Sequence, residues 1–196
     1  MKKRNQKALI YSGGHHAFVR YRQPVYDFEK KKLNSFRNTR MGNLVYARIG
    51  ARAFNIRLHA PWITKESPDK MACPAGGVID AVMAGFADKR VGFDAAGTPF
   101  GKLKDPNTYY AVGYESFKLE DICDGYIYQK PFKNYEGVTA DPLFVTAKDF
   151  QEALDGVISI EARKEFTKPE DMIENFRREA DIQRRLRYYN IICPIQ

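Results

Sequence analysis

The feature that most constrains this chain is a short stretch near its start, residues 7–18, with the sequence KALIYSGGHHAF. An apolar run meets Gly13 and Gly14, and His15 and His16 follow directly. The pattern predicts a buried strand that ends in a tight turn, because glycine adopts backbone torsions that other residues avoid. In an α/β sheet, ligands bind outside the carboxyl ends of the strands. We therefore expect a site at this turn.

The rest of the chain supplies alternating helical and extended patterns, which predict an α/β fold with a mixed or mostly parallel sheet flanked by helices. Helical spacing of apolar residues is found in residues 41–49 and 77–86, and strand patterns in residues 53–60, 90–94 and 124–129. A capping-box pattern at Thr167 predicts a long, charged C-terminal helix that runs to about Tyr188. We expect an α/β domain over residues 1–166 and a helix with a tail over 167–196.

Composition narrows the function classes. The 196 residues are 44% hydrophobic, which is typical of a globular chain, and the net charge is +8. A basic chain favours nucleic acid or acidic ligands, but no known nucleic-acid-binding motif is present, so we expect no nucleic acid partner. No apolar run has the length of a membrane span. The three cysteines lack the spacing of a zinc site or a disulfide framework, so reduced thiols and a cytoplasmic location are predicted.

The ends of other predicted strands carry residues that could act together with the two histidines. His59 closes a strand whose alternation places it away from the apolar face, and Asp94 ends another strand. Two imidazoles with a carboxylate suit Mn, Fe or Zn, or form a general-base pair. Asp124, just before a strand, is the alternative carboxylate. Asp94 also fits a simple turn towards Gly97, and the paired histidines also fit a surface turn without chemistry.

The spacing Gly13-x-x-His16, followed by a helix that opens Met41-Gly-Asn-Leu44, resembles the superfamily of erythromycin esterases, ChaN-like proteins and TraB/Tiki proteins. The resemblance covers residues 7–60 and implies that His16, rather than His15, is the motif histidine. It implies hydrolase activity, which is metal-dependent in the Tiki branch, and binding of haem or iron compounds in the ChaN-like branch. It also implies an upstream half of the site, so we expect this chain to be the C-terminal part of a larger fold.

These observations predict a hydrolase-type domain that acts on a small-molecule or peptide substrate, with a divalent metal or haem as possible cofactor. The alternatives are a binding module for haem or iron, contacted through His16 and Tyr21 or Tyr26, and a structural interaction protein. Pairing with an N-terminal half or with a second copy is expected. The predicted catalytic residues are His16, His59 and Asp94, the predicted metal ligand is His16, and the predicted binding residues are Gly13, Gly14, His15 and Tyr21.

Overall fold

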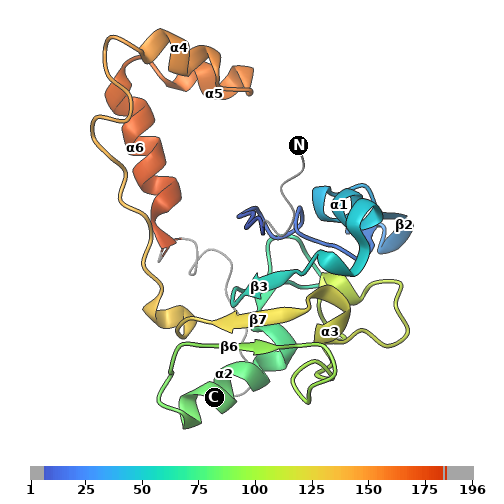
Figure 1. The fold of residues 1–196 in the computed structure, drawn as a ribbon. Coiled ribbons are helices and arrows are strands. Elements are labelled where there is room, and N and C mark those ends of the chain that lie inside the picture. The colour runs from blue at the N-terminus through green and yellow to red at the C-terminus, as the bar shows by residue number, and fades with distance from the viewer. Residues whose placement is uncertain (1–6, 183, 185–196) are drawn as a thin grey trace. The chain divides into compact units, whose positions relative to one another are not determined.

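The computed structural model describes residues 7–182 and 184, and the chain forms two compact units. Unit 1 is described over residues 7–131, and unit 2 over residues 132–182 and 184. The units divide between Pro131 and Phe132, whereas the sequence placed the boundary between residues 166 and 167. Strands and helices alternate in unit 1, so its α/β character agrees with the sequence prediction (Figure 1).

Unit 1 begins with a hairpin and then alternates between helices and short strands. Its strands are β1 (Gln23–Asp27), β2 (Lys32–Arg37), β3 (Ile56–Leu58), β4 (Trp62–Ile63), β5 (Met71–Ala72), β6 (Val91–Asp94) and β7 (Gly125–Tyr128). Its helices are α1 (Met41–Ile49), η1 (Gly50–Arg52), η2 (Pro74–Gly77), α2 (Val78–Gly85), η3 (Tyr109–Ala111) and α3 (Leu119–Ile122). The helical and strand patterns noted over residues 41–49, 77–86, 90–94 and 124–129 therefore correspond to α1, α2, β6 and β7.

The central sheet of unit 1 has three strands in the order β3-β7-β6. β3 is parallel to β7, with Ile56 opposite Gly125, and β6 is antiparallel to β7, with Asp94 opposite the same Gly125. The sheet is therefore mixed, which selects one of the two arrangements that the sequence allowed. In Figure 1 the three strands lie side by side and α2 lies against them.

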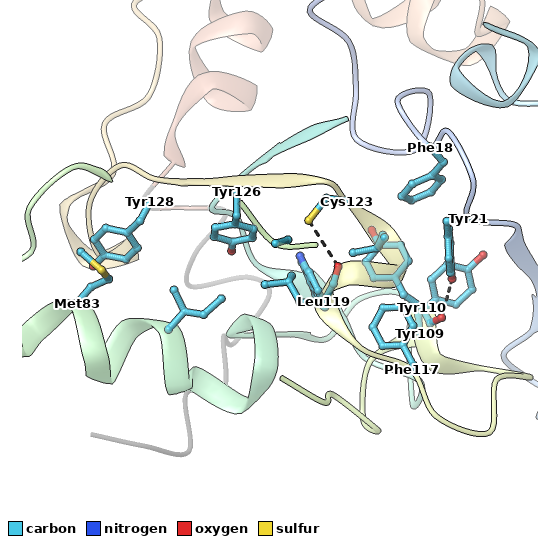
Figure 2. Packing of buried hydrophobic residues seen from close by; sticks show 14 residues of the cluster. Phe18, Tyr21, Met83, Tyr109, Tyr110, Phe117, Leu119, Cys123, Tyr126 and Tyr128 are labelled. Carbon is cyan, nitrogen blue, oxygen red and sulfur yellow. Dashed lines mark hydrogen bonds between the residues drawn. The ribbon is translucent and has the colours of Figure 1, made fainter. Parts of the chain in front are cut away.

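One aromatic core holds unit 1 together (Figure 2). Tyr126 and Tyr128 of β7 are fully buried, and Met83 of α2 lies near Tyr128. At the other end of the core, Phe18 and Tyr21 pack edge to face with a ring-centroid distance of 4.8 Å. The segment that carries the histidines is thereby anchored to the same core as the sheet.

The alternation along β3 is reversed relative to the sequence prediction. Phe54 and Ile56 are 59% and 46% exposed, whereas Asn55 and His59 are buried. Burial of these polar side chains is tolerated because they are hydrogen-bonded. Asn55 donates through Nδ2 to the carbonyl oxygen of Ile122 at 2.9 Å, and its backbone N–H donates to Asp124 at 2.8 Å. The expectation that His59 points away from the buried side is therefore wrong.

The predicted strand before the histidines is also wrong. Residues 8–13 have no regular secondary structure, and Leu9, Ile10 and Tyr11 are 94%, 57% and 89% exposed. A four-residue apolar run becomes a strand only when the backbone of a neighbouring strand pairs with it. No strand in the described part of the chain pairs with these residues. The histidines consequently lie in a turn within residues 14–17, and not at the tip of a strand.

The two cysteines in the described part of the chain differ in state. Cys123 is a free, buried thiol whose Sγ contacts the carbonyl oxygen of Leu119 at 3.6 Å (Figure 2). Burial raises the pKa of this thiol to about 12. Cys73 is fully buried and disulfide-bonded, so the expectation of reduced thiols is wrong for this residue. Cys193 lies outside the described residues.

Unit 2 is helical and has a small core of its own. It contains η4 (Phe132–Asn134), α4 (Phe150–Asp155), α5 (Ile160–Glu165) and α6 (Pro169–Ala180). Val145, Met172 and Ile173 form the buried centre. Thr167 precedes the N-cap residue of α6, and its hydroxyl group and backbone N–H both donate to Asp171 in the first turn at 2.8 Å. The continuation predicted to about Tyr188 lies outside the described residues. Among the residues described, no helix is long and apolar enough to cross a membrane.

Candidate functional site

The turn that carries the histidines is held in place by the start of α1. The backbone N–H of Gly42 donates to the carbonyl oxygen of His16 at 2.8 Å. A Cβ atom on Gly42 would lie 2.5 Å from the carbonyl oxygen of Phe18, so only glycine allows this approach. Asn43 donates through Nδ2 to the carbonyl oxygens of Val19 and Tyr21 at 3.1 and 3.0 Å. The Met-Gly-Asn sequence therefore positions the turn.

His15 is the histidine that this turn directs inwards. It is half-buried, and its Nε2 lies 3.0 Å from the hydroxyl oxygen of Tyr110, while its Nδ1 lies 3.3 Å from Nε2 of Gln23. The Gln23 amide has a defined orientation, because Arg40 Nε can only donate and lies 2.8 Å from Gln23 Oε1. Gln23 Nε2 therefore donates to His15 Nδ1 and to the hydroxyl oxygen of Tyr109, the latter at 3.1 Å. His15 accepts at Nδ1, so its hydrogen is on Nε2.

The surroundings of His15 keep its imidazole neutral. Burial is the largest cause, and the charges of Arg57, Arg40 and His16 act in the same direction, so that the pKa of His15 falls from 6.5 to about 4. At neutral pH His15 is therefore a hydrogen-bond donor through Nε2 and not a proton acceptor. A neutral imidazole in this state can polarise an oxygen atom without carrying charge.

The hydroxyl group of Tyr110 receives two hydrogen bonds. His15 Nε2 donates to it at 3.0 Å, and Arg57 Nη2 donates to it at 3.1 Å. A phenolic oxygen that accepts two hydrogen bonds still carries its own hydrogen. Tyr110 is 4% exposed, and its own hydroxyl hydrogen has no acceptor among the described residues. We call His15, Gln23, Arg57, Tyr109 and Tyr110 the His15 cluster.

Arg57 of β3 lies among aromatic rings. Its guanidinium carbon is 5.0 Å from the ring centroid of Tyr110, 5.4 Å from that of Trp62 and 5.7 Å from that of Phe18. These distances are in the range of cation–π interactions. On another side, a Cβ atom placed on Gly14 would lie 3.5 Å from Arg57 Nη1. The glycine of the turn therefore leaves the guanidinium uncovered by a side chain there.

Two of the predicted site residues, His16 and Tyr21, lie outside the His15 cluster. His16 is exposed, and its backbone N–H donates to the carbonyl oxygen of Gly13 at 2.9 Å. Tyr21 is buried and donates its hydroxyl hydrogen to the carbonyl oxygen of Tyr110 at 2.6 Å (Figure 2). Burial raises the pKa of Tyr21 far above its ordinary value. The phenol of Tyr21 is thus committed to the core and not oriented for a ligand.

His59 belongs to a separate network in the core. Its side chain is fully buried, with Nε2 at 3.0 Å from Asp80 and Nδ1 at 2.8 Å from the hydroxyl oxygen of Tyr126. The network joins the end of β3 to α2 and to β7. Both ring nitrogens are engaged, so this histidine ties three elements together.

The structure does not bring His59 and Asp94 together. The register places Asp94 opposite Gly125, at the start of β7, whereas the backbone N–H of His59 donates to the carbonyl oxygen of Ile127, nearer the end of β7. The two residues therefore lie at opposite ends of the sheet, and Asp94 is exposed. They are separated because β6 runs antiparallel to β7, a direction that strand patterns alone do not reveal.

The alternative carboxylate, Asp124, has a structural role. It forms an ion pair with Arg20 and accepts the backbone N–H of Asn55. Within residues 7–182 and 184, no group of three His, Cys, Asp or Glu side chains is arranged to hold a metal ion. A metal ligand role for His16 stays a prediction.

Sequence reasoning missed Arg57, Tyr110 and Gln23. Strand alternation alone places Arg57 on the polar side of β3, and an aromatic pair such as Tyr109 and Tyr110 is typical of a core. The hydrogen bond between Arg57 and Tyr110 joins residues 53 positions apart, and the one between Gln23 and Tyr109 joins residues 86 positions apart. No local sequence signal reveals such contacts.

Two surface hollows lie away from the His15 cluster. One, of about 590 Å³, is lined within unit 2 by residues that include Tyr135, Val138 and Arg177. Another, of about 510 Å³, is lined in unit 1 by acidic residues that include Asp27 and Glu66. Neither contains a predicted site residue. Comparison with models of known protein families, with curated proteins and with solved structures finds no match for this chain.

Proposed function

We propose that unit 1 acts on a small-molecule substrate by hydrolase-type chemistry at the His15 cluster. In this proposal Tyr110 donates its hydroxyl hydrogen to the substrate oxygen on which negative charge develops. The observation that carries it is the pair of hydrogen bonds that Tyr110 accepts from His15 and Arg57, because they direct its own hydrogen elsewhere. Donors that are already oriented towards a developing negative charge are a large source of rate acceleration in enzymes.

The exposed His16 is the proposed general base. It follows His15 in the turn, and it is among the groups that lower the pKa of His15, so the two side chains interact. Position 16 is also the motif histidine of the superfamily that the turn resembles. In this proposal His16 removes a proton from the attacking water, and Tyr110 donates a hydrogen bond to the carbonyl oxygen of the substrate.

A second candidate is a binding module for haem or an iron compound, without catalysis. The exposed imidazole of His16 favours it, since imidazole is a common ligand of haem iron. Of the two tyrosines considered with it, Tyr21 donates to a backbone carbonyl, so Tyr26 would be the contact. Titration with hemin tests this candidate, and an unchanged absorption spectrum in the Soret region would exclude it.

The test of hydrolase-type chemistry is a panel of chromogenic esters, assayed with the full chain and with Tyr110→Phe. Loss of one oxyanion donor lowers kcat by a factor of about 10² to 10³. Tyr114→Phe is the matched control, because it removes a tyrosine hydroxyl group outside the cluster, one that donates to the carbonyl oxygen of Arg22 at 2.6 Å. Equal rates in the wild-type protein and in Tyr110→Phe would contradict the proposal.

A further inference from the structure

We propose that Arg57 binds an oxyanion group, a carboxylate or a phosphate, on the molecule that occupies the His15 cluster. The inference rests on the proposed function only for the location of the site, since it names the chemical class of the ligand. Four observations carry it: the missing counter-charge, two unpaired donors, the absence of a side chain on the turn residue that faces the guanidinium, and the sign of the local charge.

Arg57 has no acidic partner within the described residues. Its one hydrogen-bonding partner there is the neutral hydroxyl group of Tyr110. Arg20, in contrast, is more exposed and still forms an ion pair with Asp124. A partly buried cation without a counter-ion is unfavourable, because burial removes part of its hydration. A bound anion would supply the missing charge.

Two donors in this neighbourhood also have no acceptor. Arg57 Nε and Trp62 Nε1 are both buried, and neither forms a hydrogen bond with a described residue. Trp62 is 1% exposed, and its ring centroid lies 5.4 Å from the guanidinium carbon. Both groups are donors only, so an acceptor is what each requires. Buried unpaired donors are rare in native proteins, and these two belong to side chains that contact each other, so a bound acceptor would satisfy them.

No side chain of the turn covers the guanidinium at position 14. A Cβ atom on Gly14 would lie 3.5 and 3.6 Å from Arg57 Nη1 and Nη2, at ordinary contact distance, so a larger side chain there would lie against these nitrogens. Gly14 is itself exposed. The planar guanidinium can therefore present N–H groups to two oxygens of one carboxylate or phosphate.

The charge around the guanidinium also favours an anion. Arg40 lies close enough to act on His15 together with Arg57, and both lower the pKa of its imidazole. Gln23, Tyr109 and Tyr110, which complete the cluster, are uncharged. Positive charge from two arginines is thus combined with neutral donors, and no carboxylate of the described chain hydrogen-bonds to any of them.

The chain offers a built-in reporter for this site, because Trp62 is its single tryptophan. The emission of Trp62 is recorded while the full-length protein is titrated with inorganic phosphate or with acetate, the ionic strength being kept constant with sodium chloride. Acetamide, which has the shape of acetate without its charge, is the ligand control. We expect a saturable change with an anion and none with acetamide.

Two substitutions at Arg57 separate charge from geometry. Arg57→Gln should abolish the saturable change, and Arg57→Lys, which keeps the charge but loses the planar fork, should weaken binding about tenfold. Arg48→Gln, at an exposed position in the last turn of α1, is the matched control and should bind like the wild-type protein. Circular dichroism of each variant verifies that it is folded.

The outcomes distinguish this inference from the proposed function. Stronger binding of acetate than of phosphate identifies a carboxylate ligand, and the reverse identifies a phosphate. Binding that depends on Arg57, without ester hydrolysis, supports the inference and contradicts hydrolase-type chemistry. A response that is non-saturable, or unchanged in Arg57→Gln, means an adventitious ion only and overturns the inference, even if neutral esters are hydrolysed.

Discussion

His15 and His59 lie in the same unit, and each has two polar partners, but the two networks end differently. The ring of His59 is enclosed between the Asp80 carboxylate and the Tyr126 hydroxyl group. The ring of His15 lies between Gln23 and Tyr110, and from Tyr110 the network continues to Arg57. Arg57 forms no ion pair with a carboxylate of the described residues. The His59 network therefore ends at the carboxylate of Asp80. In the His15 network, the Tyr110 hydroxyl hydrogen and the Arg57 guanidinium are the groups that we propose bind a ligand.

The difference shows which histidine environment suits binding. A buried histidine with a carboxylate on one nitrogen and a phenol on the other has satisfied its hydrogen-bonding capacity, and its value is structural. His15 is half-buried, its hydrogen-bonding partners Gln23 and Tyr110 are uncharged, and nearby arginines lower its pKa, so its ring stays neutral. The contrast predicts that substitutions at His59 affect stability, and that substitutions at His15 mainly affect binding.

The largest effect is expected for His59→Ala. The substitution removes a buried ring and leaves the Asp80 carboxylate and the Tyr126 hydroxyl group without this partner. We expect the free energy of unfolding, measured by urea denaturation, to fall by about 3 kcal/mol. His16→Ala, at the exposed position of the turn, is the control and should change it by less than about 0.5 kcal/mol. Equal losses in both variants would show that the His59 network does not stabilise the core.

A smaller loss is expected for Gly42→Ala, which tests whether α1 positions the His15 turn. The new Cβ atom would lie 2.5 and 2.7 Å from the carbonyl oxygens of Phe18 and Ala17, so the turn or the helix has to move. We expect a loss of about 2 kcal/mol and a weaker response of Trp62 to anions. Gly85→Ala is the control, since a Cβ atom there meets nothing within 4 Å. If Gly42→Ala is as stable as Gly85→Ala, the close approach is not needed.

The sequence predicted those elements that follow from local patterns. Apolar spacing identified α1 and α2, and strand patterns identified β6 and β7, because each pattern lies within a few consecutive residues, although Met41, Leu44 and Ile49 of α1 are exposed. It failed for residues 8–11, whose apolar character indicated a strand without indicating a neighbour. It also failed for the faces of β3, where Asn55 and His59 are buried only because their partners come from distant segments.

The candidate site was predicted in part. The glycine-histidine turn does lie next to a polar cluster. Neither Gly13 nor Gly14 has the positive φ that favours glycine, and a Cβ atom on either would make ordinary contacts, so close approach to a ligand stays a prediction. The sequence favoured His16 on the basis of a motif, whereas the inward position belongs to His15, because the turn is held by α1 and not by a strand. Arg57 and Tyr110 were missed, since their contact joins residues 53 positions apart and depends on the tertiary fold.

The smallest expected effect, and the most direct comparison of the two histidine environments, is the pH dependence of stability that His15 confers. Its pKa is lowered from 6.5 to about 4 in the folded protein, so between these values the unfolded chain binds a proton at this position that the folded chain does not. Stability due to His15 is therefore present at neutral pH and decreases as the pH falls from about 6.5 towards 4. Because the ring is only half-buried, screening reduces the change to about 1 kcal/mol.

His15→Gln keeps hydrogen-bonding capacity without titrating, so the difference in unfolding free energy between it and the wild-type protein isolates this contribution. A difference that stays constant from neutral to acid pH would mean that His15 titrates in the folded protein as it does in the unfolded chain, and that the ring is not held neutral by the cluster.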